Sequence, residues 1–339
     1  MSPDQTPVRI ALIGAGAIGL VHAEAIRLAR GAQLAAVCDN DAEAARRATV
    51  DAQARSYTSY AALAEEELPE AVVIATPPAS HRPIAEYFAR RGVHVLCEKP
   101  FATDTASARA MIHAAQTGGA LISMASKFRF VTDVRAAREA IAAGRIGRVR
   151  QLDLAFTGNV DMRDRWNADR EISGGGVIID NGTHAVDIFR YLGGALRNVR
   201  AVEPVRRHDL AVEDTAAIYA RLGNGSVACA DLTWSLDKRL AQYLRICGDG
   251  GAIELGWAGS RMRCGENERW TEFGSGYSKM RAFVGAIENF AGAVRGEAVL
   301  EVTAADALAS VEAIDAAYAS LRFNMWIDLG SAAPAGVLR

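Results

Sequence analysis

The fold is decided by residues 8–19, which have the sequence VRIALIGAGAIG. The first half, Val8–Ile13, is a run of apolar and β-branched residues that predicts a buried strand. A Gly-x-Gly-x-x-Gly pattern, Gly14–Gly19, follows at once and leads into the helix-like segment Leu20–Ala29. In a strand–turn–helix unit these glycines make the turn, admit a pyrophosphate and let the helix pack on the strand. We therefore predict a dinucleotide-binding unit with the phosphates at a helix N-terminus.

An acidic residue strengthens this prediction. A second apolar segment, Gln33–Cys38, ends at Asp39, which lies 20 positions after Gly19. A carboxylate at that place accepts hydrogen bonds from the ribose hydroxyls of a dinucleotide. The following residues, Asn40 and Asp41, offer no arginine for a 2′-phosphate, so the sequence favours NAD over NADP.

Strands and helices then alternate as far as residue 125. We expect strands at Ala71–Ala75, Val93–Cys97 and Ala120–Ala125, and helices at Asp41–Ala54, Tyr60–Glu67, His81–Arg91 and Thr103–Thr117. Apolar strands that alternate with helices indicate an α/β fold with a parallel, doubly wound Rossmann sheet. Such sheets bind ligands at the carboxyl ends of their strands, where Gly14, Asp39, Thr76 and Glu98-Lys99 fall.

The pattern changes after a helix expected at Val131–Ala143. Segments that alternate apolar and polar residues predict strands at Val149–Asn159, Arg197–Arg206, Thr215–Leu222, Ser226–Leu236, Tyr243–Cys247, Ala252–Trp257 and Arg261–Gly265. Glycine-rich turns between them indicate hairpins, hence a large, mostly antiparallel open sheet in an α+β domain. We divide the chain into a Rossmann domain (1–125), a substrate-binding and oligomerisation domain (126–330) and a loose tail (331–339). The two closing helices, Tyr277–Arg295 and Thr303–Arg322, can pack back on the first domain.

The composition excludes several classes of protein. A length of 339 residues suggests two domains, and the formal charge of −2 gives no reason to expect a nucleic-acid or membrane partner. No apolar run is long enough to span a bilayer, and Met1–Pro7 is too short and polar for a signal peptide. The five cysteines form no Cys-x-x-Cys pair, which suits a reducing, cytoplasmic location. Histidine, cysteine and acidic residues show no metal-ligand spacing, so we expect no metal.

A second motif, SGGGVIIDNGTHAVD at residues 173–187, carries the candidate chemistry. Asp180 and His184 lie four positions apart, so on a helix they share a face and can hydrogen-bond. A carboxylate that orients an imidazole is a common general base near neutral pH. The alternative is a glycine loop before a helix that carries one surface ion pair. Lys99 has a similar alternative as a surface lysine at the end of a strand.

Together these motifs resemble a known family. The glycine pattern, Asp39, Thr76-Pro77-Pro78 with His81, Glu98-Lys99-Pro100, Gly144 to Gly147 and Gly174–Asp187 occur in the order and spacing of the glucose–fructose oxidoreductase, inositol dehydrogenase and rhizopine-catabolism family. The resemblance covers residues 8–330. It implies a Rossmann domain, an open-sheet domain that often mediates oligomers, and hydride transfer between nicotinamide and a sugar, inositol or related alcohol.

The resemblance also implies roles for individual residues. It implies that Lys99 is the catalytic lysine, His184 the acid/base and Asp180 its partner. Pattern and resemblance together predict cofactor contacts at Gly14, Gly16, Ala17, Ile18, Gly19, Asp39, Thr76, Pro77, His81, Glu98 and Lys99. They predict substrate contacts at Lys99, Lys127, Trp166, Asn167, Asp180 and His184. The chain departs from the family at Arg129-Phe130-Val131-Thr132, where relatives often have a proline, which leaves the substrate open.

We therefore expect an NAD-dependent dehydrogenase or reductase, of the class that acts on CH–OH groups, whose substrate is a cyclic polyol. A reductase or dehydrogenase of nucleotide-linked sugars is the alternative within enzymes. A cofactor-sensing regulator that has lost the chemistry should lack Lys99 or His184, and both are present. A sheet with helices on one face leaves the other face to be covered, so we also expect a homodimer or homotetramer joined through the second domain.

Overall fold

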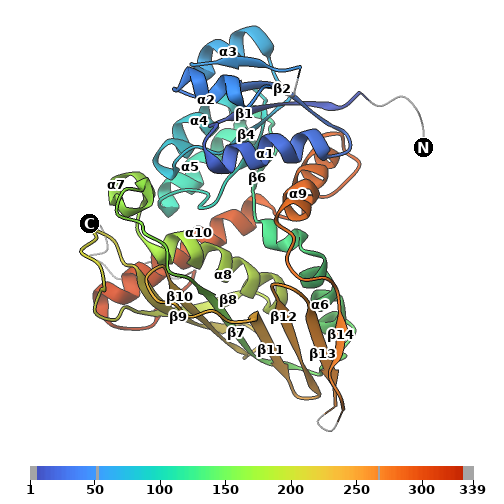
Figure 1. Ribbon diagram of the computed structural model, residues 1–339, viewed down its shortest axis with the longest axis vertical. Helices are drawn as coiled ribbons and strands as arrows, with labels where there is room; N and C mark the ends of the chain where they lie inside the picture. The colour runs from blue at the N-terminus through green and yellow to red at the C-terminus, as the bar shows by residue number, and fades with distance from the viewer. Residues whose placement is uncertain (1–5, 51–52, 266–267, 331–339) are drawn as a thin grey trace. The chain divides into compact units, whose positions relative to one another are not determined.

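The computed structural model describes residues 6–50, 53–265 and 268–330. The chain forms two compact units (Figure 1). Unit 1 combines Met1–Phe130 with Lys279–Leu308, and unit 2 combines Val131–Ser278 with Ala309–Arg339. We expected the first domain to end at residue 125, whereas unit 1 continues to Phe130 and includes a later segment. The expected tail, 331–339, lies outside the described residues.

Unit 1 is built on a parallel six-stranded sheet in the order β3-β2-β1-β4-β5-β6. Its strands are β1 (Val8–Ile13), β2 (Ala32–Cys38), β3 (Arg55–Tyr57), β4 (Ala71–Ile74), β5 (His94–Cys97) and β6 (Ile122–Met124). This strand order is that of the dinucleotide-binding Rossmann fold. The predicted fold class of the first domain is confirmed.

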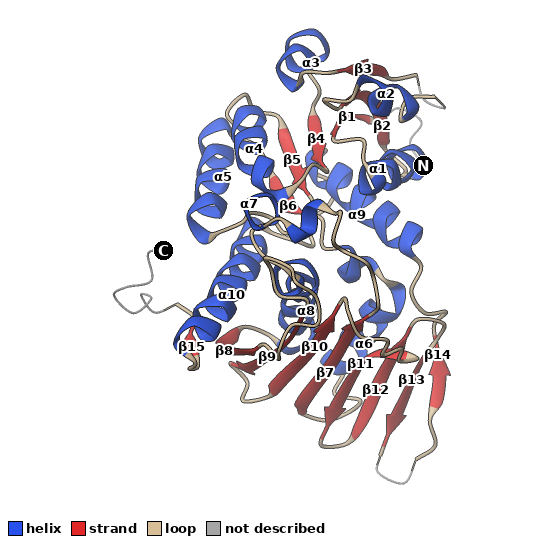
Figure 2. Ribbon diagram, turned by 60° about the vertical axis from the view of Figure 1, so that its left-hand side comes forward, coloured by secondary structure: helices blue, strands red, loops and turns tan. Residues whose placement is uncertain are grey.

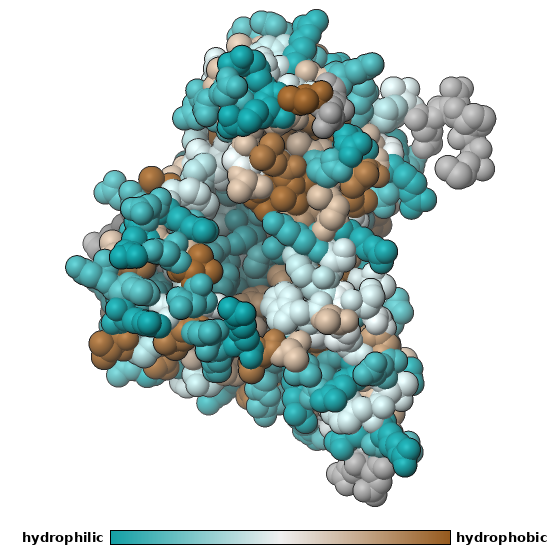
Figure 3. Space-filling model, in the orientation of Figure 1, coloured by the Kyte–Doolittle hydropathy of each residue, from teal (hydrophilic) through white to brown (hydrophobic). Residues whose placement is uncertain are grey.

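Helices cover both faces of this sheet (Figure 2). They are α1 (Ala17–Leu28), α2 (Ala42–Arg47), α3 (Tyr60–Glu67), α4 (His81–Ala89), α5 (Thr105–Gly118) and α9 (Lys279–Val294). The last of these returns from far along the chain and lies beside α1 (Figure 1). Phe283, Ile287 and Phe290 of α9 join the apolar core around β1 and β2. Figure 3 shows a hydrophobic surface patch over α1, where Leu20 and Leu28 are exposed.

One helix is much shorter than its sequence suggests. We expected Asp41–Ala54 to be helical, but α2 ends at Arg47 and Arg55–Tyr57 forms the edge strand β3. Alanine favours a helix locally, and this propensity misled the prediction. The three residues of β3 have half-exposed or exposed side chains and show no apolar run, so no periodic signal marks the strand.

Unit 2 is built on a nine-stranded sheet in the order β14-β13-β12-β11-β7-β10-β9-β8-β15. Its strands are β7 (Val149–Thr157), β8 (Leu196–Val202), β9 (Thr215–Leu222), β10 (Val227–Thr233), β11 (Gln242–Gly248), β12 (Gly251–Gly256), β13 (Ser260–Cys264), β14 (Thr271–Phe273) and β15 (Ile327–Asp328). Only β7 and β10 are parallel neighbours in this described sheet. The predicted mostly antiparallel sheet is confirmed, and the short strands β14 and β15 were not predicted.

Helices pack on one face of this sheet (Figure 2). They are α6 (Thr132–Ala142), α8 (Val177–Gly193) and the later part of α10 (Ala304–Phe323), while the single turn α7 (Arg170–Ser173) precedes α8. The register pairs Leu152 with Ala228 and Phe156 with Leu232, and these buried residues form the face on which α8 packs. The opposite face carries no helix of the described part of unit 2 (Figure 2).

Candidate functional site

The glycine loop of unit 1 contains two glycines that the backbone requires, Gly14 and Gly19, and one, Gly16, that faces open space. Gly14 has a φ of 98°, and a Cβ at Gly19 would lie 2.0 Å from the carbonyl oxygen of Gly14. Both positions therefore require glycine for the backbone itself. A Cβ at Gly16 would meet nothing within 4 Å, and Gly16 is the N-cap of α1, which has no side-chain cap. Ala17 and Ile18 form the first turn of α1. The open space beside this N-terminus fits a pyrophosphate.

Asp39 lies against the same loop. The amide N–H of Ala15 donates to its Oδ2 at 2.6 Å, and that of Asp41 donates to its Oδ1 at 2.9 Å. These bonds fix the half-exposed carboxylate at the carboxyl end of β2, beside the glycine loop. Each oxygen retains a second lone pair, so the pair can still accept from the two hydroxyls of a ribose.

A pocket of about 270 Å³ lies near Asp39, between α2 and the segment that follows β3. Arg46 and Tyr57 are among its lining residues, and the Tyr57 carbonyl accepts from the Asp39 amide at 3.1 Å. The guanidinium of Arg46 is ion-paired with Glu43 at 2.5 Å. Both side chains of this ion pair are largely exposed, at 64% and 60%, so the pair adds little to the choice between NAD and NADP.

His81 lies at a structural junction. Its ring is fully buried, with Nε2 2.8 Å from the carbonyl oxygen of Thr76 and Nδ1 3.0 Å from that of Pro100. Burial lowers the pKa of His81, against the effect of these two carbonyl groups. The ring therefore ties the end of β4 to the segment after β5. We assign His81 a positioning role, whereas Thr76 and Pro77 remain partly exposed on the loop itself.

The backbone of Lys99 is hydrogen-bonded to the buried carboxylate of Glu98, which in turn contacts His22. Glu98 is 5% exposed, and its Oε1 lies 2.7 Å from Nε2 of the fully buried His22. Its Oε2 accepts from the backbone N–H of Lys99 at 2.9 Å, and the Lys99–Pro100 peptide is cis. No local sequence pattern links His22 to Glu98, because the two residues lie 76 positions apart. The pair fixes the backbone of Lys99 at the carboxyl end of β5.

Neighbouring positive charges lower the pKa of Glu98. Burial raises the pKa of Glu98, but the hydrogen bond and charge of His22 and the charges of Lys99 and Lys127 outweigh it, so the pKa is lowered. Lys127 lies in the 3₁₀ turn Lys127–Phe130, with its Nζ 5.6 Å from the ring centroid of Phe283 on α9. Unit 1 thus brings both predicted lysines close to one buried carboxylate.

In unit 2, α8 carries the predicted acid/base pair. Asp180 and His184 lie one turn apart on this helix, with Asp180 half-buried and His184 only 8% exposed. The ring of Phe156 on β7 meets the imidazole edge-on, at 6.2 Å between centroids. Asp187 is buried, so it is not a surface residue. The helix therefore carries Asp180 and His184 one turn apart, with the imidazole against Phe156, the first ring of an aromatic wall formed by Phe156, Trp257, Tyr243 and Tyr277.

The aromatic wall extends away from His184 to a residue that we did not predict. Phe156 lies 6.1 Å from the ring of Trp257, which also contacts Tyr243 at 4.8 Å and Tyr277 at 5.6 Å. Trp257 is 41% exposed although it packs against three rings. No local spacing links Trp257 to His184, because the two rings are connected through Phe156. The predicted contacts Trp166 and Asn167 lie instead in the 3₁₀ turn Trp166–Ala168, outside this described chain of rings.

Two further features bear on the class of protein. Within residues 6–50, 53–265 and 268–330, no three His, Cys, Asp or Glu side chains are grouped as metal ligands. None of the helices in those ranges is long and apolar enough to cross a membrane. The five cysteines are free, and burial raises the pKa of Cys38 to about 11, which makes it a poor nucleophile.

Comparison with known proteins places the chain among oxidoreductases. Residues 8–126 match the family described as "Oxidoreductase family, NAD-binding Rossmann fold", and residues 134–254 match the "GFO/IDH/MocA C-terminal domain". Inositol 2-dehydrogenase of Rhizobium meliloti is 28% identical over 93% of this chain and 97% of the relative. D-apiose dehydrogenase of Paraburkholderia graminis is 32% identical over 66% of this chain, and the match spans only 60% of that relative.

A solved structure shares the fold over nearly the whole chain. It is an oxidoreductase from Agrobacterium radiobacter in complex with NAD⁺, L-tartaric acid and magnesium. The match has a TM-score of 0.84 at 23% identity and covers 96% of this chain and 99% of that one. With both domain models matched in order, the chain belongs to the GFO/IDH/MocA family of NAD-binding oxidoreductases.

Proposed function

We propose that the protein is an NAD-dependent dehydrogenase or reductase of a cyclic polyol, an inositol or a pyranose sugar. It exchanges hydride between nicotinamide and a secondary alcohol or ketone carbon. The observation that carries this proposal is one edge of the parallel sheet, where the open Gly16, the carboxylate of Asp39 and the anchored Lys99 follow the carboxyl ends of β1, β2 and β5. A cofactor held by the first two would extend towards the third.

NAD, when bound, supplies the hydride acceptor for oxidation. The N-terminus of α1 would hold its pyrophosphate, and Asp39 would hold its ribose hydroxyls. Thr76, Pro77 and Glu98 complete the proposed edge with Lys99, and His81 keeps the loop in place.

The residues of the chain move the proton in this proposal. In the oxidation direction, Nε2 or Nδ1 of His184 accepts the hydroxyl proton of the substrate as the carbon gives up its hydride. The ammonium of Lys99 donates a hydrogen bond to the same oxygen and stabilises the negative charge that develops on it. Asp180 orients the imidazole and stabilises its cationic form. Lys127 adds positive charge near Lys99, since the charges of both lysines act on Glu98.

The aromatic wall of unit 2 supports a ring-shaped substrate. The apolar C–H faces of inositols and pyranoses pack on aromatic rings, and Trp257 presents a partly exposed ring that continues the wall beside His184. We propose that Trp257 contacts the substrate. Trp166 and Asn167, in the 3₁₀ turn before α7, remain proposed contacts of the substrate.

We also propose that the enzyme is a cytoplasmic homodimer or homotetramer. The five free cysteines suit a reducing compartment. The sheet face opposite α8 carries exposed Tyr219 and Val227, and no helix of the described part of unit 2 covers this face. A second copy would cover that face.

One experiment separates the proposed substrates. Inositols, aldoses and sugar nucleotides are offered with NAD or NADP, and the reduced cofactor is followed by its absorbance. We expect turnover of a free cyclic polyol with NAD, absent from His184→Ala protein prepared in parallel. Turnover of sugar nucleotides alone would favour the alternative activity, and turnover by neither class would overturn both.

A further inference from the structure

The start of α8 is held by one residue from another part of the chain. The Oε1 atom of Glu213 accepts from the amides of Gly176 and Ile178, both at 3.0 Å. The backbone carbonyl of Glu213 accepts from the amide between them, that of Val177, at 2.9 Å. Three consecutive amides at the N-terminus therefore find their acceptors on a single residue, 37 positions further along. The helix has no side-chain cap of its own at Gly176.

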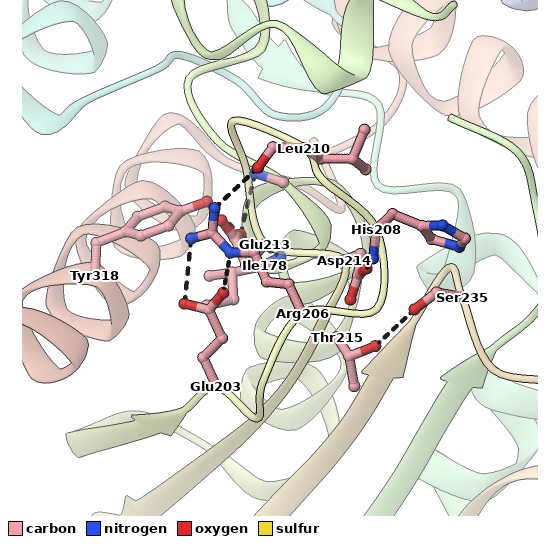
Figure 4. A network of polar contacts seen from close by, with 11 residues as sticks. Ile178, Glu203, Arg206, His208, Leu210, Glu213, Asp214, Thr215, Ser235 and Tyr318 are labelled. Atoms are coloured by element: carbon pink, nitrogen blue, oxygen red, sulfur yellow. Dashed lines mark hydrogen bonds and ion pairs between the residues drawn. The ribbon is translucent and has the colours of Figure 1, made fainter. Parts of the chain in front are cut away.

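A tyrosine completes this arrangement from the opposite side. The hydroxyl of Tyr318 on α10 donates to the same Oε1 of Glu213 at 2.8 Å (Figure 4). Glu213 is only 5% exposed, and burial raises its pKa against the effect of the hydrogen bonds it accepts. A buried carboxylate with three donors on one oxygen is a strong and directional anchor.

The glycine cluster before α8 is explained by the same two residues. A Cβ at Gly176 would lie 2.0 Å from the carbonyl oxygen of Glu213, and a Cβ at Gly175 would lie 1.9 Å from the hydroxyl oxygen of Tyr318. Any side chain at either position would push the anchor away. In the structure, Glu213 and Tyr318 occupy the space beside these two glycines.

The loop that carries Glu213 is braced separately. Arg206 pairs with Glu203 and donates to the carbonyl of Leu210 at 3.0 Å, and its charge acts on Glu213 (Figure 4). Asp214 accepts from the amide of His208 at 3.1 Å. The loop is therefore ordered by its own contacts, so it can fix α8 rather than follow it.

We propose that Glu213 and Tyr318 form a clamp that positions Asp180 and His184 for catalysis by fixing the first turn of α8. Asp180 lies one helical turn after Gly176, because the amide of Asp180 donates to the carbonyl of Gly176 at 3.0 Å. A displacement of the first turn would thus move the carboxylate and the imidazole together. The inference rests on the proposed function, because its catalytic consequence needs His184 to be the acid/base.

The test compares variants at the clamp with one beside it. Glu213→Ala removes the acceptor, Glu213→Gln keeps one oxygen, and Tyr318→Phe removes one donor. A misplacement of about 1 Å can cost roughly 100-fold in rate. We expect kcat to fall about 10- to 100-fold in Glu213→Ala and less in the two milder variants, with the Kd for NAD unchanged. Val205→Ala, at a 97% exposed position in the same loop, should keep wild-type kcat.

Two readouts separate the clamp from the chemistry. Hydrogen exchange of the peptide that spans residues 174–184 needs no substrate, and it should quicken in Glu213→Ala but not in Val205→Ala. Unchanged exchange would overturn the clamp, even if polyol oxidation is confirmed. Faster exchange with wild-type kcat in a folded Glu213→Ala protein would overturn the positioning role. Wild-type protein that oxidises no polyol would overturn the proposed function, while the exchange result would still decide whether the clamp exists.

Discussion

Among single residues, we propose that Asp39 sets the choice of cofactor. Its carboxylate is fixed by the amides of Ala15 and Asp41 and would repel a 2′-phosphate. Asp39→Ser combined with Asn40→Arg should therefore shift the preference towards NADP, measured as the ratio of kcat/KM for the two cofactors. Asp39→Ser alone is the control that removes the repulsion without adding a cation. Wild-type protein that already prefers NADP tenfold would contradict this account of Asp39.

A second residue, Trp257, tests the proposed substrate contact. Because its exposed ring would lie against the C–H face of the substrate, Trp257→Ala should raise KM about 10-fold or more, equivalent to roughly 1.4 kcal/mol. Trp257→Phe should restore part of the loss, and the Kd for NAD should not change. Trp166→Ala is the matched variant for the other exposed tryptophan proposed to contact substrate. A KM unchanged in Trp257→Ala would exclude this ring from the site.

At the scale of elements, the glycine loop offers a matched pair of substitutions. Gly19→Ala places a Cβ 2.0 Å from a backbone oxygen, whereas Gly16→Ala places one in open space. We expect Gly19→Ala to lower Tm. We expect Gly16→Ala to keep Tm and weaken NAD binding, because its methyl group occupies the space proposed for the pyrophosphate. Thermal melts with and without NAD measure both effects, and the reverse pattern would place the cofactor elsewhere.

The elements also show what the sequence can and cannot predict. The strand β1, the glycine loop and α1 were predicted because their signals are local: an apolar run, three spaced glycines and a helical period. The strands β3 and β14 were not predicted, because each has only three residues and these are exposed or partly exposed. The contacts that organise the site were not predictable. His22 meets Glu98 and Gly176 meets Glu213 only through the fold, and no periodicity spans 76 or 37 positions.

At the scale of the whole molecule, the proposed assembly makes a clear forecast. Val227→Glu puts a charge on the sheet face opposite α8, where Val227 is already 45% exposed. The change should cost the single chain little but disfavour a covered interface. Light scattering at micromolar concentration should show a dimer or tetramer for wild type and a smaller species for Val227→Glu. Val299→Glu, at a position 85% exposed in unit 1, serves as the control. A monomeric wild type would contradict the assembly.

We propose that His184 and Lys99 act on one substrate oxygen, and the kcat values of their alanine variants measure whether they do. A positioned acid/base contributes about 10²–10⁴ in rate, and one donor to a developing oxyanion contributes about 10²–10³. His184→Ala and Lys99→Ala should therefore each lower kcat by at least about 100-fold, with Asp180→Asn intermediate or comparable. Thermal melts and NAD titrations should show folded proteins with little change in cofactor affinity. A folded His184→Ala protein with near wild-type kcat would contradict the claim.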